Sequence, residues 1–365
     1  MNNRRVIVAA LTVIVVIAAV VVSQQKAPQT SREKTSLFPE LAGKINDVSE
    51  LVIRDGETTL TVQRVSDRWG IAEADDYPAL VDDVKQAVLA VSDLQVVAEK
   101  TSNPDLYKRL GVEDPDSLGA TSHLLTLKSD GDELARLIVG ATRRSKSASS
   151  APGLYVRIPG QQHALLVEGR LSVSADIIQW IKRDIVNIEG DRVSAVHIQP
   201  AGGQEVSLER AEPGDDLVLQ NIPEGKEQQS EYLISRIATI LENVYVDAVG
   251  REDSFDYSRP DAVINVATFD GLVADIETVK SGEHTHARFS FSAQPGRADN
   301  GETDGDGSTD EEEIKVTPEQ EAETLNRLAE GWAYQLSTSK AELFNQSLSD
   351  LVREPENEEP EDDSG

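Results

Sequence analysis

The 365-residue sequence contains no cysteine, and this absence removes several classes of site at once. Without a thiol the chain can form no disulfide framework, no thiolate zinc site, no cysteine nucleophile and no lipid-modified cysteine of a mature lipoprotein. An exported protein can do without disulfides when its cores are large enough. A hydrophobic content of 39% over this length is sufficient for two packed modules.

Aromatic residues and positive charge are also scarce. Aromatic residues make up 4% of the sequence, which leaves little material for a base-stacking or carbohydrate-binding platform. The formal net charge is -30, and such a chain repels polyanions, so we expect no nucleic acid partner. Residues 299–313 carry eight acids and residues 354–365 carry seven, with no base in either segment. We interpret both as solvated chain, an acidic loop at 295–313 and a disordered tail at 353–365.

An apolar run near the amino terminus predicts a membrane anchor. Val6–Val22 holds 17 residues, all but one of them apolar, and Arg4 and Arg5 come directly before it. As a helix the run would be about 26 Å long, close to the roughly 30 Å of a hydrocarbon core, and the arginines would keep their end in the cytoplasm. We therefore expect a cytoplasmic end at 1–5, a transmembrane helix at 6–22 and a polar linker at 23–36.

A cleaved signal peptide is the alternative interpretation of this run, because Val21 and Ser23 are acceptable residues beside a cleavage site. The apolar run is longer than the roughly 7–15 residues usual in such peptides, and no clear Ala-x-Ala follows it. The uncleaved anchor is the better interpretation, and it places the rest of the chain on the far side of the membrane.

Two segments of the chain follow one order of predicted strands and turns. Val48–Ile71 alternates apolar and polar residues around a glycine turn, and Val193–Leu219 repeats the pattern with a longer turn. Alternation of this kind is typical of strands with one buried face. Further strands are predicted at 123–128, 133–139, 154–158, 163–167, 263–269 and 272–279.

Helical patterns lie between these strands at matching places. The first has Pro78 near its first turn, with Val84, Val88 and Val91 on one face; the second spans Glu231–Asn243. The expected fold class is therefore α+β: a transmembrane helix followed by two duplicated modules, 37–185 and 186–352, each an antiparallel sheet packed with one or two helices.

Two capping boxes predict helices near the carboxyl terminus. They begin at Thr317–Gln320, with proline at the first helical position, and at Ser339–Glu342. Between them, Trp332–Leu336 reads as a short strand that returns to the second sheet.

The acidic loop contains the one spacing that resembles a calcium site. Glu302, Asp304, Asp306 and Glu313 occupy positions 1, 3, 5 and 12 of an EF-hand loop, with Gly307 at position 6. The first ligand should be Asp, position 8 is polar, and no helix precedes the loop. We therefore prefer a solvated loop and assign no metal or other cofactor.

Other candidate motifs are weaker. His284 and His286 share a strand face and could bind a metal with Glu283, but an exposed strand face is the ordinary interpretation. Ser337-Thr338-Ser339-Lys340 matches the Ser-x-x-Lys pattern of acyl-transfer enzymes without its companion motifs, and Ser339 is better explained as a helix cap. Arg143, Arg144 and Lys146 form a basic cluster in a serine-rich loop.

The anchor and several segments together resemble one bacterial family. These segments are LFPELAGKINDVSELVI, DRWGI, DLYKRLGVEDP, QWIKRDIVNIEGDRVSAVHI and GWAYQLSTSKAELFNQSLSDLV. They are similar to the family known as domain of unknown function 4340, over Leu37 to Val352. The resemblance implies a membrane-anchored protein that carries the domain as a repeat, encoded beside ABC transporter components associated with gliding motility.

The expected function is therefore a non-enzymatic interaction protein. It would be anchored in the bacterial inner membrane by residues 6–22, with the bulk of the chain extracytoplasmic, as an accessory subunit of a membrane complex such as an ABC transport system. The alternative is an envelope hydrolase whose site collects His123, His163 or His197 with carboxylates. A calcium-binding module is a weaker alternative.

Overall fold

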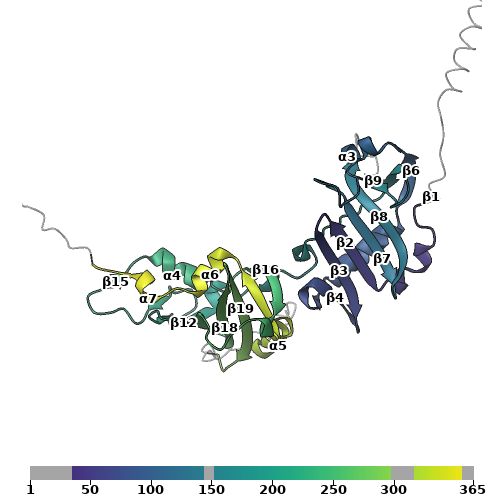
Figure 1. Ribbon diagram of the computed structural model, residues 1–365. Coiled ribbons are helices and arrows are strands. Elements are labelled where there is room, and N and C mark those ends of the chain that lie inside the picture. The colour runs from purple at the N-terminus through teal and green to yellow at the C-terminus, as the bar shows by residue number, and fades with distance from the viewer. Residues whose placement is uncertain (1–34, 144–151, 297–315, 356–365) are drawn as a thin grey trace, which may run out of the picture.

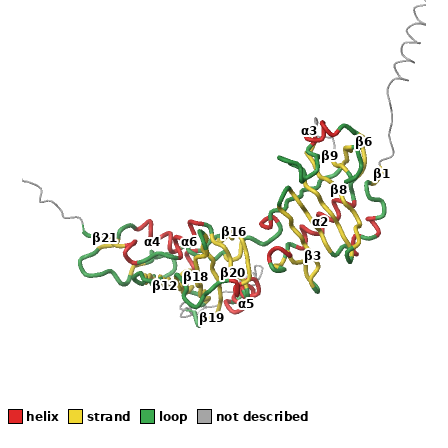
Figure 2. The backbone as a smooth tube through the Cα atoms, in the orientation of Figure 1, coloured by secondary structure: helices red, strands yellow, loops and turns green. Residues whose placement is uncertain are grey.

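The computed structural model describes residues 35–143, 152–296 and 316–355, which form two lobes (Figure 1). Both lobes consist mainly of antiparallel strands with few helices, a mixed α+β fold (Figure 2). The expected anchor at 6–22 and the calcium-like residues Glu302, Asp304, Asp306 and Glu313 lie outside the described residues. Within the described ranges, no helix is both long and apolar enough to span a bilayer.

The first lobe is a ten-stranded sheet in the order β1-β6-β10-β9-β8-β7-β2-β3-β4-β5. The strands are β1 Thr35–Ser36, β2 Glu50–Asp55, β3 Thr58–Val65, β4 Arg68–Ile71, β5 Tyr77–Pro78, β6 Gln95–Glu99, β7 His123–Ser129, β8 Asp132–Arg143, β9 Gly153–Arg157 and β10 Ala164–Glu168. Two helices accompany them, α2 (Val81–Ser92) and the short α3 (Tyr107–Leu110).

The second lobe is a nine-stranded sheet in the order β11-β16-β20-β19-β18-β17-β12-β13-β14. The strands are β11 Asp184–Val186, β12 Val193–Pro200, β13 Val206–Glu209, β14 Val218–Leu219, β16 Val244–Arg251, β17 Ala262–Thr268, β18 Leu272–Ser281, β19 His284–Ala293 and β20 Trp332–Leu336. The helices are α4 Glu231–Ala238, α5 Pro318–Ala329, α6 Thr338–Phe344 and α7 Leu348–Leu351. A two-stranded ribbon pairs β15 (Glu227–Gln228) with β21 (Val352–Arg353).

The nine strands of the second sheet correspond in order to the first nine of the ten-stranded sheet, and β5 has no counterpart. β10 is the last strand of the first sheet in chain order, and it lies between β6 and β9. β20 is the last strand of the second sheet, and it lies between β16 and β19. The six further strands predicted from the sequence are confirmed as β7, β8, β9, β10, β17 and β18, and β7 pairs with β8, β9 with β10, and β17 with β18. The predicted strand at Trp332–Leu336 is β20, and it does return to the second sheet.

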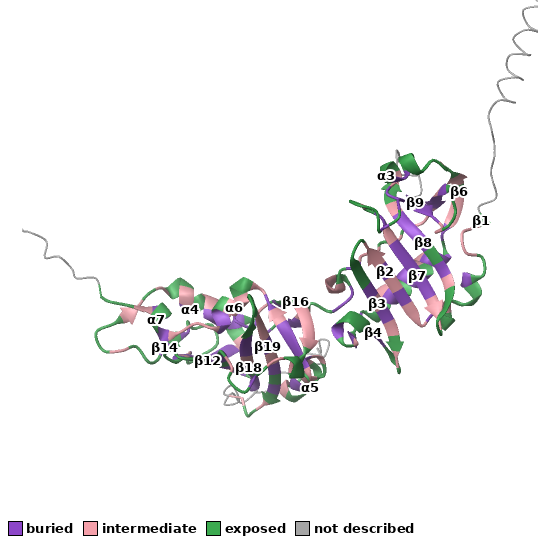
Figure 3. Ribbon diagram, in the orientation of Figure 1, coloured by how far each residue is buried: buried purple, intermediate pink, exposed green. Residues whose placement is uncertain are grey.

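The core follows directly from the alternating pattern. Leu51, Ile53, Leu60 and Val62 are fully buried because alternate residues of a strand point to the same face. Val84, Val88 and Val91 of α2 pack against the same core from one side of the helix. Figure 3 shows the result as buried stripes along the central strands.

Two predicted helix boundaries are wrong. Pro78 lies in β5, where it pairs with Gly70, and α2 begins only at Val81. The second helix ends at Ala238 instead of Asn243, because the following residues form tighter turns and Asn243 adopts a left-handed backbone with a φ of 49° before β16 begins.

The capping boxes give a mixed outcome. Thr317 caps α5 as predicted: its side-chain oxygen accepts from the Gln320 backbone N–H, and the Gln320 side-chain oxygen accepts from the Thr317 backbone N–H. The box predicted at Ser339 is wrong, since Ser337 caps α6 through the Lys340 N–H. Ser337 comes directly after β20, so the helix begins as soon as the strand ends.

Aromatic side chains join the two lobes. Tyr77 of β5 is 2% exposed, and its ring lies edge-on 4.8 Å from Trp332. Its hydroxyl is 3.4 Å from that of Tyr334, which itself donates to the Leu328 carbonyl. Tyr77 must therefore donate to Tyr334. Burial raises the pKa of both hydroxyls, so both keep their protons at ordinary pH.

Two hairpin glycines give a matched test of this fold. Gly271 has a φ of +102°, and a Cβ there would overlap the Gln294 carbonyl oxygen; Gly282 has a φ of +63° and open space around it. We expect Gly282→Ala to cost about 1 kcal/mol of unfolding free energy, from left-handed strain alone. Gly271→Ala should cost at least about 3 kcal/mol, because steric overlap adds to the strain. Urea denaturation of both variants measures the difference, and equal losses would contradict the described turn.

Candidate functional site

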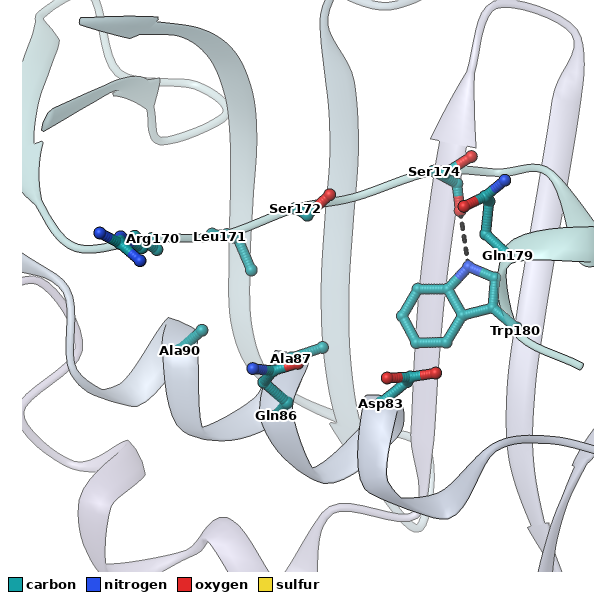
Figure 4. A pocket seen from close by; sticks show the side chains of 10 residues that line it. All are labelled: Asp83, Gln86, Ala87, Ala90, Arg170, Leu171, Ser172, Ser174, Gln179 and Trp180. Carbon is teal, nitrogen blue, oxygen red and sulfur yellow. Dashed lines mark hydrogen bonds between the residues drawn. The ribbon is translucent and has the colours of Figure 1, made fainter. Parts of the chain in front are cut away.

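A groove runs along α2 in the first lobe. It encloses about 420 Å³ between the helix and segment 170–180, which ends in a 3-10 turn at Ile177–Gln179, and Figure 4 shows the side chains that face it. The lining residues are Asp83, Gln86, Ala87, Ala90, Arg170, Leu171, Ser172, Ser174, Gln179 and Trp180. The groove exists because α2 presents two alanines beneath this segment, where larger side chains would fill the space.

Trp180 closes one end of this groove. Its indole N–H donates to the Ser174 carbonyl at 2.9 Å, and its own carbonyl accepts from the Leu80 N–H at 2.7 Å. These two bonds hold the segment against the start of α2. The groove therefore has a fixed shape and offers serine hydroxyls, one cation and one carboxylate. Sequence reasoning missed it, because residues 170–180 show no periodicity that would indicate a site.

Each lobe also carries an arginine stacked on a tyrosine, on corresponding strands. Arg157 of β9 lies 4.7 Å from the centre of the Tyr107 ring, and Arg288 of β19 lies 4.6 Å from that of Tyr257. Arg157 is buried and fully occupied: it donates to the Val112 carbonyl at 2.8 Å and pairs with Asp114 at 2.6 Å. These contacts identify the first cluster as structural.

The second cluster is less completely paired. Arg288 forms an ion pair with Glu277 at 3.0 Å. The Tyr257 hydroxyl is buried without a hydrogen-bond partner, whereas the Tyr107 hydroxyl donates to the Gln162 carbonyl. Burial raises the pKa of Tyr257 well above the usual value, so its hydroxyl stays protonated.

His284 and His286, the predicted metal pair, differ in their surroundings. His284 is exposed, while the His286 ring stacks on Phe255 with 4.2 Å between centroids. The Nδ1 atom of His286 is buried without a partner. Across the part of the chain that the structure describes, no group of three or more potential ligands is placed to hold a metal ion.

The histidines considered for a hydrolase site lie apart from the cavities. His123 Nε2 is 3.5 Å from Asp55 Oδ2, His197 Nδ1 is 3.2 Å from Ser207 Oγ, and His163 is exposed. Among the described residues, none of these three side chains lines the α2 groove or any of four other well-formed cavities. Of the basic cluster, Arg143 ends β8, and Arg144 and Lys146 lie outside the described residues.

The Ser-x-x-Lys match is explained by structure. The Lys340 ammonium donates to the carbonyls of Thr239 at 3.0 Å, Ile240 at 3.1 Å and Glu242 at 2.6 Å. These carbonyls follow the end of α4, so Lys340 fastens α6 to the turn that leads into β16. Burial lowers the pKa of Lys340 to about 8. Ser337 is a helix cap whose hydroxyl accepts from the Lys340 backbone N–H, while the Lys340 ammonium donates to these three carbonyls.

The fold is thus a pair of antiparallel sheets, each with a helix on one face and with its last strand in the interior. A family described as Domain of unknown function (DUF4340) matches residues 69–262, from β4 of the first sheet to the start of β17 in the second. The chain belongs to this family. No curated protein and no solved structure was found to match the chain.

Lys340 provides a stability test. Lys340→Met should lower the unfolding free energy by about 1–3 kcal/mol, because three carbonyls lose their buried donor. Lys85→Met is the matched control: its ammonium lies on the exposed side of α2, 3.6 Å from Asp82, and we expect less than about 0.5 kcal/mol. Denaturant titration measures both, and a loss at Lys85 as large as that at Lys340 would contradict the capping role.

His286 provides a pH test. Burial, and secondarily the neighbouring His284, lower the pKa of His286 below its ordinary 6.5. Between that folded value and 6.5 the unfolded chain holds more protons, so this residue makes stability fall as the pH drops below 6.5. His286→Phe keeps the stacking and removes the titration, so its melting temperature should decline less between pH 7 and pH 5. His284→Gln removes only the secondary cause, so as the control it should keep most of the wild-type decline; an unchanged slope in His286→Phe would refute the assignment.

Proposed function

We propose that the protein is a non-enzymatic interaction protein of the cell envelope, anchored in the bacterial inner membrane by residues 6–22. The charged and apolar pattern of the amino terminus supports the anchor, and the family resemblance supports the envelope setting. In this proposal residues 35–355 face the extracytoplasmic side and serve as an accessory subunit of a membrane complex, such as an ABC transport system of gliding-motility type.

The groove on α2 is the observation that carries the interaction proposal. Alanines form the base of this groove, and serines, Asp83 and Arg170 lie along its sides. A segment of a partner protein fits such a groove, because the serines can hydrogen-bond to its backbone and the two charged residues can pair with side chains of either sign. The clasp formed by Tyr77, Trp332 and Tyr334 supports a docking role as well. It fixes one lobe against the other, so that binding would cost little ordering entropy.

Internal duplication is part of the same proposal. The shared order of nine strands supports it, as does an arginine stacked on a tyrosine at corresponding strands of both lobes. The registers agree too: Arg157 lies opposite Ala164 on β10, and the register of β19 with β20 sets Arg288 opposite Ala333. A duplicated scaffold would present two related surfaces to one complex.

The test is recovery of partners from living cells. The full chain with a carboxyl-terminal tag is crosslinked in intact cells, solubilised in mild detergent and analysed by mass spectrometry. We expect near-stoichiometric recovery of permease or ATPase subunits. Ala90→Trp, which fills the groove, should reduce that recovery about tenfold, whereas Lys85→Trp, on the exposed side of the same helix, should leave it unchanged.

Each other outcome is informative. Recovery of the protein alone would overturn the accessory role, and equal recovery from Ala90→Trp would place the contact elsewhere than the groove. Deletion of residues 6–22 tests the anchor separately: the shortened chain should leave the membrane fraction, and its retention there would refute the anchor.

A further inference from the structure

The second lobe contains a cavity that is larger than the α2 groove and is lined by a buried arginine. It measures about 660 Å³ and lies between α4 and the connection from β13 to β14. Arg210 lines it and is 8% exposed, together with the buried apolar side chains Leu217 and Ile234. The exposed acids Asp191, Asp215, Asp216 and Glu231 also line it, together with the half-buried Glu242, whose Oε1 accepts from the Gly190 N–H at 2.7 Å. The cavity therefore has a buried cation and apolar surface within, and acids at its mouth.

The Arg210 charge is incompletely compensated. Its Nη2 donates to the Gly190 carbonyl at 3.0 Å, and its Nε is buried without a partner. Among the residues that the structure describes, no carboxylate forms an ion pair with this guanidinium. A buried charge without a counter-ion is costly, and an arginine presents a planar fork that suits a carboxylate.

Comparison with the first lobe identifies Arg64 as the corresponding residue. The Arg64 N–H donates to the Ser49 carbonyl at 2.8 Å, and the Arg210 N–H donates to the Ser194 carbonyl at 3.0 Å. Arg64 lies in β3 and Arg210 directly follows β13, and these strands pair in the same way, Val62 with Ile71 on one sheet and Leu208 with Leu219 on the other.

The two arginines nevertheless have different surroundings. Arg64 is exposed and lies 5.3 Å from the centre of the Trp69 ring. In the second lobe Leu217 takes the place of Trp69, and the connection before it is two residues longer. The smaller side chain leaves the cavity open above Arg210. A surface arginine stacked on an indole is thus replaced by a buried arginine with no stacking partner.

The charge arrangement selects the ligand. A simple anion would be repelled by the four acids at the mouth, and a simple cation would be repelled by Arg210 inside. A molecule that carries a carboxylate at one end and positive charge further along can pair with Arg210 inside the cavity and with the acids at its mouth. We propose that this cavity binds the free carboxyl terminus of a short basic peptide, with the carboxylate on Arg210, an apolar last side chain on Leu217 and Ile234, and lysine or arginine side chains at the acids.

The experiment uses the full chain in detergent and the fluorescently labelled tripeptide Lys-Lys-Leu with a free carboxylate. We expect saturable binding by fluorescence anisotropy that weakens with added salt, since the acids at the mouth are exposed. The amide of the same peptide, which lacks the carboxylate, should bind at least about tenfold more weakly, and so should Glu-Glu-Leu. These comparisons need no variant of the protein.

Three variants test the residues. Arg210→Gln should weaken binding at least about tenfold, while the matched control Arg64→Gln should leave it unchanged, with thermal unfolding used to verify that both are folded. The double variant Asp215→Asn and Asp216→Asn changes only exposed side chains and should weaken binding severalfold. Absence of saturable binding, equal binding of the amide, or unchanged affinity in the aspartate variant would overturn the proposal. None of these results bears on partner recovery through the α2 groove.

Discussion

The contact on which the arrangement of the molecule depends is the insertion of Tyr77 beside Trp332 and Tyr334. Two sheets joined only by a chain segment would move freely, because interfaces between domains of one chain are usually small. Here an aromatic ring from the edge of the first sheet is buried in the second, and its hydroxyl has a partner there. Arg251, 4.8 Å from the centre of the Trp332 ring, covers the cluster from the solvent side. The grooves on the two lobes are therefore held in a fixed mutual orientation.

The two lobes share a strand order, but the side chains at corresponding positions differ. Opposite Arg157 the neighbouring strand places Ile138, whereas opposite Arg288 it places Glu277. The first arginine therefore turns to a backbone carbonyl and Asp114, and the second takes its carboxylate from the strand beside it. Arg64 and Arg210 differ for the same reason, because the side chains beside them differ. The common strand order keeps corresponding residues in corresponding places. A single side chain at such a place, Trp69 in one lobe and Leu217 in the other, decides whether the space beside the arginine is filled or forms a cavity.

Local patterns in the sequence were sufficient to predict most strands, because the alternation of apolar and polar residues follows directly from the burial of one face of a strand. They predicted β7, β8, β17, β18 and the return of β20. They misplaced the end of α4, where tight turns held by Lys340 replace the last helical residues, and they placed the α6 cap two residues late. The aromatic clasp could not be predicted, since Tyr77 and Tyr334 are separated by 257 positions. The cavity at Arg210 was hidden for a related reason: an isolated arginine near a turn carries no signal of its burial.

The interior position of β10 and β20 has a consequence for folding during synthesis. Until the last strand of a sheet leaves the ribosome, that sheet consists of two pieces, each with an unpaired edge beside the gap. The contacts that close it join distant parts of the chain, which is slow compared with local folding. The first sheet can close once residue 168 has emerged, but the second must wait until almost the whole chain is available. A nascent molecule therefore passes through a stage in which one finished lobe precedes one lobe whose unpaired strand edges are prone to aggregation.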